Sequence, residues 1–345
     1  MKAARLYGEE DIRIDDVEAP TPGPGEVLVD VAACGICGSD LHFYQHPDDF
    51  FDDEDLPLTL GHEIGGTIAE TGEGVDIEVG TEVVLGPHTP CGECWCCEEG
   101  KYNLCRDLNA TSARPGGYAE QVVESADNAV PLPENVSPED AAIAQPVSVG
   151  LHAVRQSPLG IGDSVAVVGA GPIGLGAIRS AKAAGAGPIY VSEPQDSRRE
   201  VAAEFGADVL VDPSEEDAVE RIREETGRGV DVAFEAVGHE NTLRQAVEST
   251  RADGHTTVIG VFSDSVEFEP QLLVQDQRTV GGSTSHLLGP RLTEEYGVVI
   301  RQLERGDLDA DRYVTSRIGL DDVVSDGFEA LLADDSDERK ILVCP

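Results

Sequence analysis

The first third of the chain contains short segments in which apolar and polar residues alternate, and glycine and proline separate these segments. Segments 26–37 and 63–72 show this pattern, and segment 116–125 repeats it after a group of cysteines. Alternation with a period of two is typical of half-buried strands. The pattern therefore predicts a β-rich region before residue 150.

Beyond residue 150 the apolar positions form continuous runs. A strand-like run at 164–169 is followed by a helical segment at 172–186, and the alternation continues to a run at 255–262. Uninterrupted apolar strands that alternate with helices are typical of a parallel sheet covered on both faces. We therefore predict an α/β fold whose centre is a doubly wound parallel sheet.

The alternation stops after about Gly282, and the tail contains two helical patterns and a short apolar strand. We found no internal repeat and no low-complexity linker. These shifts predict that a domain formed by residues 150–284 is inserted into a β-rich domain formed by residues 1–149 and 285–345.

A glycine-rich turn joins the first strand of the parallel region to its first helix. Its sequence is Gly169-Ala170-Gly171-Pro172-Ile173-Gly174. Glycines in this pattern allow a tight turn and let the backbone approach a pyrophosphate, and the helix start offers free N–H groups to that anion. The strand–turn–helix context distinguishes it from an ordinary glycine turn, so we predict a dinucleotide site.

Glu193 lies at the end of the second strand of this region. A carboxylate there accepts hydrogen bonds from ribose hydroxyls and repels a 2′-phosphate, which favours NAD over NADP. Arg198 and Arg199 follow closely and would offset that repulsion, so NADP stays an alternative.

Four cysteines lie within fifteen residues, and four thiolates can close a tetrahedral zinc shell. They are Cys91, Cys94, Cys97 and Cys105. Cys96 is an alternative ligand beside Cys97, because spacing does not distinguish the two. A closed shell stabilises a loop and does no chemistry, so we predict a structural zinc site.

A second group offers an incomplete metal shell. The group consists of Cys37, Ser39, Asp40 and His42, followed about twenty residues later by the pair His62-Glu63. One thiolate, one imidazole and one carboxylate leave a position open for substrate or water. A buried thiol and a core histidine are the alternative interpretation. The cysteine group and the dinucleotide motif favour a catalytic zinc.

The charge excludes several partners. There are 67 acidic against 24 basic residues, a formal net charge of −43 spread along the whole chain. Such a surface repels nucleic acids and anionic membranes. Molar salt screens this self-repulsion to a length of about 3 Å, so we expect a high-salt cytoplasm. No apolar run reaches the ~20 residues that span a bilayer, and the N-terminus lacks a secretory signal.

The motifs together resemble those of the zinc-dependent medium-chain alcohol and polyol dehydrogenases, over nearly the full length. Within that family the chain looks most like the (R,R)-2,3-butanediol dehydrogenase branch, which is near the sorbitol and L-threonine dehydrogenases. The matching segments include CGICGSDLHFY, LTLGHEIGGTIAETGEGV, PCGECWCCEEGKYNLC and VGAGPIGLGAIRSAKAAGA. The resemblance implies a GroES-like catalytic domain, a Rossmann domain, two zinc ions per chain and a homo-oligomer. It also implies hydride transfer between a secondary alcohol, such as a vicinal diol, and NAD.

The resemblance also implies the roles of the metal group. Cys37 and His62 are expected as direct ligands of the catalytic zinc, with Glu63 as a ligand or just behind the metal. Asp40 is expected to orient His62. Gln145 is a departure, because polyol-type members carry glutamate there; a glutamine can coordinate through its carbonyl oxygen but brings no charge.

Further roles follow from the same resemblance. Ser39 is expected to take the alcohol proton, and His42 to pass it to solvent through the cofactor ribose. Val261, Phe262 and Ser283 fall where family members hold the nicotinamide.

Two alternative functions from other classes of protein have less support from the sequence. A zinc-ribbon module that binds nucleic acid needs a basic surface, which a chain of charge −43 lacks. A regulator that senses NAD without turnover needs no open metal site. A sugar or polyol dehydrogenase is the alternative within the enzyme reading.

Overall fold

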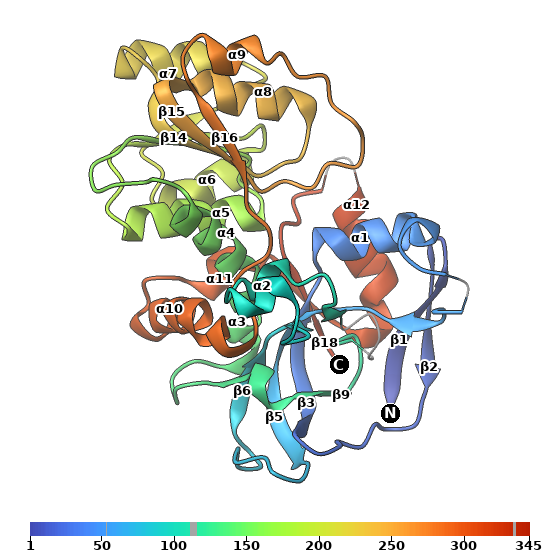
Figure 1. Cartoon of the computed structure of the whole chain (residues 1–345). Coiled ribbons are helices and arrows are strands. Elements are labelled where there is room, and N and C mark those ends of the chain that lie inside the picture. Colours follow the sequence, from blue (N-terminus) through green and yellow to red (C-terminus); the bar gives the residue numbers. More distant parts are fainter. Residues whose placement is uncertain (53, 111–115, 334–335) are drawn as a thin grey trace. The chain divides into compact units, whose positions relative to one another are not determined.

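The computed structural model describes residues 1–52, 54–110, 116–333 and 336–345 (Figure 1). The chain divides into two compact units. We call Pro146–His286 the inserted unit, and we call Met1–Gln145 together with Leu287–Pro345 the divided unit. A β-rich unit and a unit with a parallel sheet confirm the predicted fold class.

The inserted unit is built on six parallel strands. They are β11 (Val165–Val168), β12 (Ile189–Ser192), β13 (Val209–Val211), β14 (Val230–Glu235), β15 (Thr250–Val258) and β16 (Thr279–Gly282). Their order in the sheet is β13-β12-β11-β14-β15-β16. The order therefore reverses between β11 and β14, where open parallel sheets bind their ligands. Val165 is paired on both sides, with Ile189 and with Val232.

Helices connect these strands. They are α5 (Pro172–Ala183), α6 (Asp196–Phe205), α7 (Ala218–Thr226), α8 (Glu240–Ser249) and α9 (Gln271–Val274). A further helix, α4 (Ala144–Gln156), starts in the divided unit and precedes β11. Local signals fix their ends. Asp217, for example, accepts hydrogen bonds from the N–H groups of Val219 and Glu220 at the start of α7, and Gly227 ends that helix with a φ of 71°.

The divided unit contains one seven-stranded sheet and two smaller ones. Its strands are β1 (Lys2–Gly8), β2 (Asp11–Asp16), β3 (Glu26–Gly35), β4 (Leu58–Thr59), β5 (Glu63–Thr71), β6 (Glu82–Leu85), β7 (His88–Thr89), β8 (Asn109–Ala110), β9 (Gln121–Ser125), β10 (Ala129–Pro131), β17 (Ser316–Gly319) and β18 (Ile341–Cys344). The large sheet has the order β10-β6-β5-β3-β18-β17, with β9 also paired to β3. The smaller sheets are β2-β1-β4 and β7-β8.

The long strand β3 holds the divided unit together. It pairs with β5 and β9, and the last described strand of the chain pairs with its end, Val343 opposite Cys34. The core around β3 and β5 includes the almost fully buried side chains of Val27, Val29 and Ile68. The sheet thus joins the two ends of the sequence into one core.

The helices of the divided unit are mostly short. They are α1 (Gly38–Gln45), α2 (Trp95–Glu98), α3 (Pro138–Ala141), α10 (Leu292–Arg305), α11 (Ala310–Tyr313) and α12 (Glu329–Leu332), with 3₁₀ turns at Pro47–Asp49, Tyr102–Leu104, Ala126–Asn128, Gly289–Arg291 and Leu320–Asp322. The second helical pattern of the tail is not one α-helix. It begins as a π-helical turn, Val323–Phe328, and only then becomes α12. A Cβ on Gly327 would lie 2.9 Å from the Cδ1 atom of Ile36, so a larger residue here would require the end of that side chain to shift.

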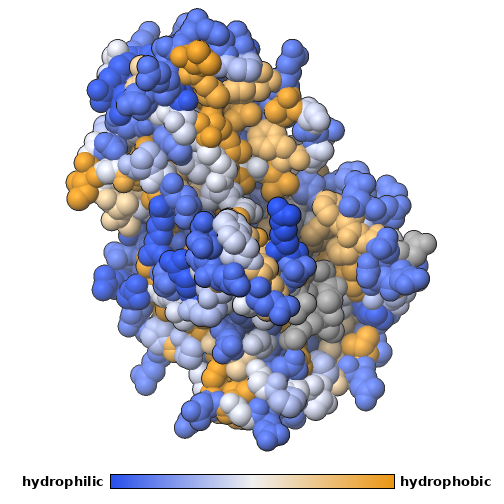
Figure 2. Space-filling model, in the orientation of Figure 1, coloured by the Kyte–Doolittle hydropathy of each residue, from blue (hydrophilic) through white to orange (hydrophobic). Residues whose placement is uncertain are grey.

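Hydrophilic residues dominate the face drawn in Figure 2, as expected from a charge of −43. Within the part of the chain that the structure describes, no helix is both long and apolar enough to cross a membrane.

Candidate metal centres and dinucleotide site

Four cysteine side chains of the loop between β7 and β8 converge on one point. We call Cys91, Cys94, Cys97 and Cys105 the cysteine cluster. The Sγ–Sγ distances are 4.0 Å (Cys91–Cys97), 3.6 Å (Cys94–Cys97), 3.7 Å (Cys94–Cys105) and 3.4 Å (Cys91–Cys105). A tetrahedral ion with Zn–S bonds of about 2.3 Å requires sulfur atoms roughly 3.8 Å apart. The four thiols therefore fit a zinc ion without rearrangement.

The neighbouring thiol of Cys96 does not belong to the cluster. Cys96 and Cys97 are consecutive in the helix α2, so their side chains point in different directions. The backbone N–H of Cys97 lowers the pKa of Cys94 to about 6, whereas burial raises the pKa of Cys97 to about 12. Of the two alternatives that spacing left open, the structure brings Cys97, and not Cys96, together with the other three cysteines.

This selection yields a prediction with a matched control. We expect Cys97→Ser to lose one zinc ion per chain and to make the loop between Cys91 and Cys105 sensitive to protease, because three thiolates no longer close the shell. Cys96→Ser makes the same chemical change one residue away and should leave zinc content unchanged. Zinc per chain by atomic absorption checks both, and equal losses would contradict the assignment.

A second possible metal group lies in the divided unit. Ligand atoms of Cys37, His62 and Glu63 all lie within 4.8 Å of one another. Cys37 precedes the helix α1, and His62 precedes β5 after Gly61, which has a φ of 98°. A Cβ at Gly61 would meet the Sγ atom of Cys34 at 2.7 Å, so glycine is required for this close approach.

Asp40 lies beside both Cys37 and His62. Its carboxylate is fully buried; Oδ2 accepts hydrogen bonds from the Tyr118 hydroxyl (2.7 Å) and the Cys37 N–H (2.9 Å). Its Oδ1 lies 3.5 Å from Nδ1 of His62. Because Nδ1 faces Asp40, Nε2 is the nitrogen left for an ion.

The same contacts determine the directions in which the pKa values of Asp40 and His62 are shifted. Burial alone would raise the pKa of Asp40, but His62 and the hydrogen bonds lower it. Burial alone would lower the pKa of His62, but the charges of Asp40 and Cys37 hold that pKa well above its usual value. The pocket is therefore suited to positive charge, and a metal ion would supply it in place of the imidazole proton.

Glu63 has a partner that the sequence did not reveal. Both of its carboxylate oxygens accept hydrogen bonds from Nζ of Lys340, at 2.8 and 2.7 Å. Lys340 also donates to the carbonyl oxygen of Ile36 (2.7 Å), and its side chain and that of Glu63 are at most 2 % exposed. Of the two expected positions for Glu63, this buried ion pair favours the one just behind the metal.

A cavity of about 220 Å³ opens beside this group. The polar residues that line it are Ser39, Asp40, Thr59, His62 and His88. Its apolar lining is Phe43, Phe51, Leu58 and Leu60. His42 and Gln145 are not among the lining residues; His42 is half-buried and Gln145 is buried. Sequence reasoning missed His88 and the two phenylalanines, because no motif connects them to the metal group.

The glycine-rich turn of the inserted unit has the predicted geometry. Gly169 has a φ of 92°, and a Cβ on Gly174 would lie 2.0 Å from the carbonyl oxygen of Gly169. Gly171 precedes α5 and has no atom within 4 Å of its Cβ position, so space lies open in front of the helix start. Pro172 and Ile173 begin α5, where the missing N–H of proline costs nothing. These features suit a pyrophosphate at the helix N-terminus.

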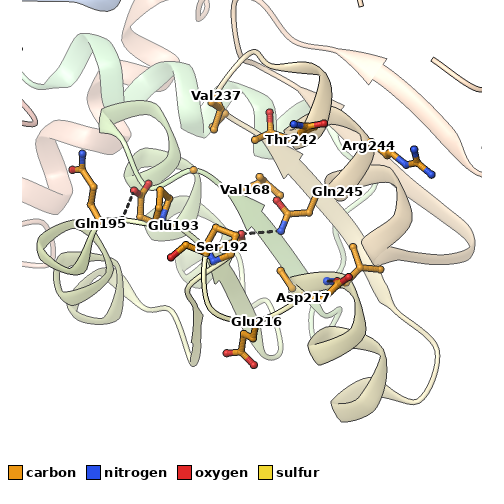
Figure 3. Close-up of a pocket in the computed structure, with 18 of the residues that line it drawn as sticks. Val168, Ser192, Glu193, Gln195, Glu216, Asp217, Val237, Thr242, Arg244 and Gln245 are labelled. Carbon is orange, nitrogen blue, oxygen red and sulfur yellow. Dashed lines mark hydrogen bonds between the residues drawn. The ribbon is translucent and has the colours of Figure 1, made fainter. Parts of the chain in front are cut away.

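The turn borders a cavity of about 910 Å³ at the carboxyl ends of the strands (Figure 3). Glu193 lies in it, with Oε2 accepting from the N–H of Ala170 (2.8 Å) and Oε1 from that of Gln195 (3.0 Å). Figure 3 also shows Gln245, which donates to the Ser192 hydroxyl (2.9 Å). Arg198 lines the same cavity.

The other predicted cofactor residues lie outside this cavity. Arg199 does not line it, and pairs with Asp196 and Asp212. Val261, Phe262 and Ser283 follow β15 and β16, and none of them is among the lining residues. Their role toward the nicotinamide stays a prediction.

Comparison with known proteins agrees with this geometry. The family model of the alcohol dehydrogenase GroES-like domain matches residues 23–134, and that of the zinc-binding dehydrogenases matches residues 172–304. An (R,R)-butanediol dehydrogenase of Bacillus subtilis is 40 % identical, with 100 % of both chains covered. An L-threonine 3-dehydrogenase of Pyrococcus abyssi is 36 % identical over 96 % of this chain and 94 % of the relative. A sorbitol dehydrogenase of Bacillus subtilis is 34 % identical over 100 % and 97 %.

Solved structures give the same result. The crystal structure of 2R,3R-butanediol dehydrogenase from Bacillus subtilis superposes with a TM-score of 0.87 at 39 % identity, covering 100 % of this chain and 99 % of that chain. A protein from Sinorhizobium meliloti that is assigned to the zinc-binding dehydrogenases and was solved with NADP has a TM-score of 0.88 at 34 % identity, with coverage of 100 % and 99 %. The chain therefore belongs to the zinc-binding medium-chain alcohol dehydrogenase family.

Proposed function

We propose that this dehydrogenase transfers hydride reversibly between a vicinal diol, such as 2,3-butanediol, and NAD. The observation that carries the proposal is the pair Cys37–His62, oriented by Asp40 beside a small and mainly apolar cavity. The resemblance to butanediol dehydrogenases supports the diol, and the glycine turn supports the dinucleotide.

The residues of the divided unit suit this chemistry. A zinc ion held by Cys37 and His62 would supply Lewis-acid activation of an alcohol oxygen. Ser39 lines the cavity, and its hydroxyl both donates and accepts, as proton transfer requires. His42 lies three residues further along α1, on the same side of the helix, and is half-buried. It can therefore carry the proton from Ser39 toward solvent.

The charge of the metal group is unusual for this chemistry. Lys340 neutralises Glu63, and Gln145 is a neutral side chain. We infer that Cys37 is the one uncompensated anion among the expected ligands, which leaves a bound cation strongly polarising. Gln145→Glu should therefore shift the rising limb of the pH–rate profile for alcohol oxidation to higher pH. Gln145→Asn, which adds no charge, is the control; unchanged profiles for both variants would refute the inference.

The size and lining of the cavity favour a short diol over a sugar or a hexitol. Pockets for drug-sized ligands run from about 300 to 1,000 Å³, and this cavity is smaller. Phe43, Phe51 and Leu58 offer no hydrogen bond to a fully hydroxylated chain. A polyol, glucose or threonine dehydrogenase is the alternative function.

A substrate panel tests the proposal. The purified protein in molar KCl, with NAD, is given 2,3-butanediol, sorbitol, glucose and L-threonine in turn. We expect kcat/KM to be highest for butanediol, and chelation of zinc to abolish NADH formation. Preference for sorbitol, glucose or threonine would establish the alternative, and binding of NAD without turnover of any of them would indicate a regulator.

The position of Glu193 leads to a prediction about the cofactor. Its carboxylate is 3 % exposed and fixed by two backbone N–H groups, so it opposes a 2′-phosphate at a defined place. Glu193→Gln removes the charge with little change in shape and should move the ratio of kcat/KM for NAD and NADP toward NADP by about tenfold. Glu215→Gln, which changes a carboxylate elsewhere in the same cavity, should have little effect. Equal shifts in both variants would mean that only the overall charge matters.

We further infer two zinc ions per chain, a homo-oligomer and a cytoplasm of high salt. The two metal groups support the zinc count, and the charge of −43 supports the salt requirement. Each inference has its own test. Zinc analysis tests the number of ions, and analytical ultracentrifugation tests the oligomeric state. Thermal unfolding between 0.1 and 3 M KCl, roughly the range from physiological to fully screening salt, tests the salt requirement.

A further inference from the structure

Two polar side chains that line the 220 Å³ cavity, those of Thr59 and His88, have no role in the chemistry described above. Among the polar residues of its lining, His62 belongs to the metal group, Asp40 is expected to orient His62, and Ser39 is expected to take the alcohol proton. His88 lines the same cavity and is assigned to none of these tasks. We propose that His88 binds the second oxygen of a vicinal diol and makes the cavity selective for diols over simple secondary alcohols. This inference rests on the proposed function.

His88 is held by its surroundings. It lies in β7, which pairs with β8 and closes the loop that carries the cysteine cluster. The next residue, Thr89, accepts a hydrogen bond from Nδ2 of the buried Asn128 (2.9 Å), and that amide also donates to Glu124 (3.2 Å). Cys91 follows only three residues after His88. A binding group needs such a rigid support to discriminate between ligands.

The chemistry of imidazole suits both directions of the reaction. A neutral histidine has one N–H donor and one nitrogen acceptor. It can accept from the hydroxyl of a diol or donate to the carbonyl oxygen of an α-hydroxyketone. One side chain can therefore form a hydrogen bond with the second oxygen of the substrate and with that of the product.

The apolar lining limits the rest of the ligand. Phe43 packs edge-to-face against Phe51, with ring centroids 5.2 Å apart, and against Phe50 at 4.9 Å. Leu58 and Leu60 complete this apolar lining. A ligand with two adjacent oxygens and methyl ends leaves no polar group without a partner here, whereas a hydroxyl at either end would face carbon.

The test compares two substrates that differ by one hydroxyl, 2,3-butanediol and 2-butanol. We expect His88→Leu to lower kcat/KM for the diol about ten- to thirtyfold, mainly through KM, because one hydrogen bond to the substrate is lost. The value for 2-butanol should change less than about threefold, since that alcohol makes no such bond. His88→Gln retains a donor and an acceptor and should recover most of the loss.

Two further readouts separate the outcomes. Zinc content should remain two per chain in His88→Leu, which shows that the neighbouring cysteine cluster is intact. An equal loss with both alcohols, or no loss with the diol, would overturn the role of His88 while the proposed function stands. If the unmodified protein oxidises 2-butanol but not the diol, the proposed substrate is wrong, and the inference falls with it.

Discussion

Cys37→Ala should reduce alcohol oxidation by at least about a thousandfold, because Lewis-acid activation contributes several kcal/mol and each 1.36 kcal/mol is a factor of ten. The variant removes one of the two expected direct ligands, and His62 with Glu63 alone does not hold a metal tightly when Glu63 is paired with Lys340. Zinc content should fall from two ions per chain to one. The binding of NADH, measured by fluorescence, should persist because the glycine turn lies in the inserted unit.

Cys344→Ala is the matched control. Cys344 is also a free cysteine of the divided unit, at the end of β18, and it belongs to neither metal group. This variant should retain activity and both zinc ions. Full activity in Cys37→Ala would disprove the assignment of the catalytic metal group, whatever its zinc content.

Lys340→Met should lower the free energy of unfolding by about 3–5 kcal/mol, the usual result of removing one partner of a buried ion pair. Glu63 is fully buried and both of its oxygens depend on Lys340, so the variant leaves a charge without its partner. Urea unfolding followed by circular dichroism measures the loss.

Two comparisons show whether burial is the cause. Lys2→Met breaks an exposed pair with Asp321, whose side chains are 48 % and 66 % exposed, and should cost less than about 1 kcal/mol. The double variant Lys340→Met/Glu63→Gln removes both charges and should recover most of the stability. Equal losses for Lys340→Met and Lys2→Met would show that the pair behind the metal group is not special.

The parallel sheet was predictable because its signals are local. Each strand of the inserted unit is a short apolar run, and the turn Gly169–Gly174 marks the first strand–helix connection. The cysteine cluster was predictable for the same reason, except that Cys96 and Cys97 are adjacent. The direction of their side chains depends on the helix α2, which spacing does not specify.

The remaining features of the site depend on long-range contacts. Lys340 and Glu63 are 277 residues apart, and no periodic pattern connects them. His88 enters the cavity because β7 pairs with β8 across the cysteine loop, and Phe51 enters it from an irregular segment. Such pairings are decided by tertiary packing, so a single sequence without homologues does not reveal them.

The origin of β18 affects how the protein is made. During translation, the continuous stretch Pro146–His286 is available in full before the second part of the divided unit has been synthesised. Ile341–Cys344 leaves the ribosome after every other strand described here, and Lys340 only just before it. Until then the Cys34–Gly35 end of β3 lacks the pairing that β18 supplies, and Glu63 has no counter-ion. The nucleotide-binding part of the nascent enzyme is therefore assembled first, and the half that carries the chemistry is completed last.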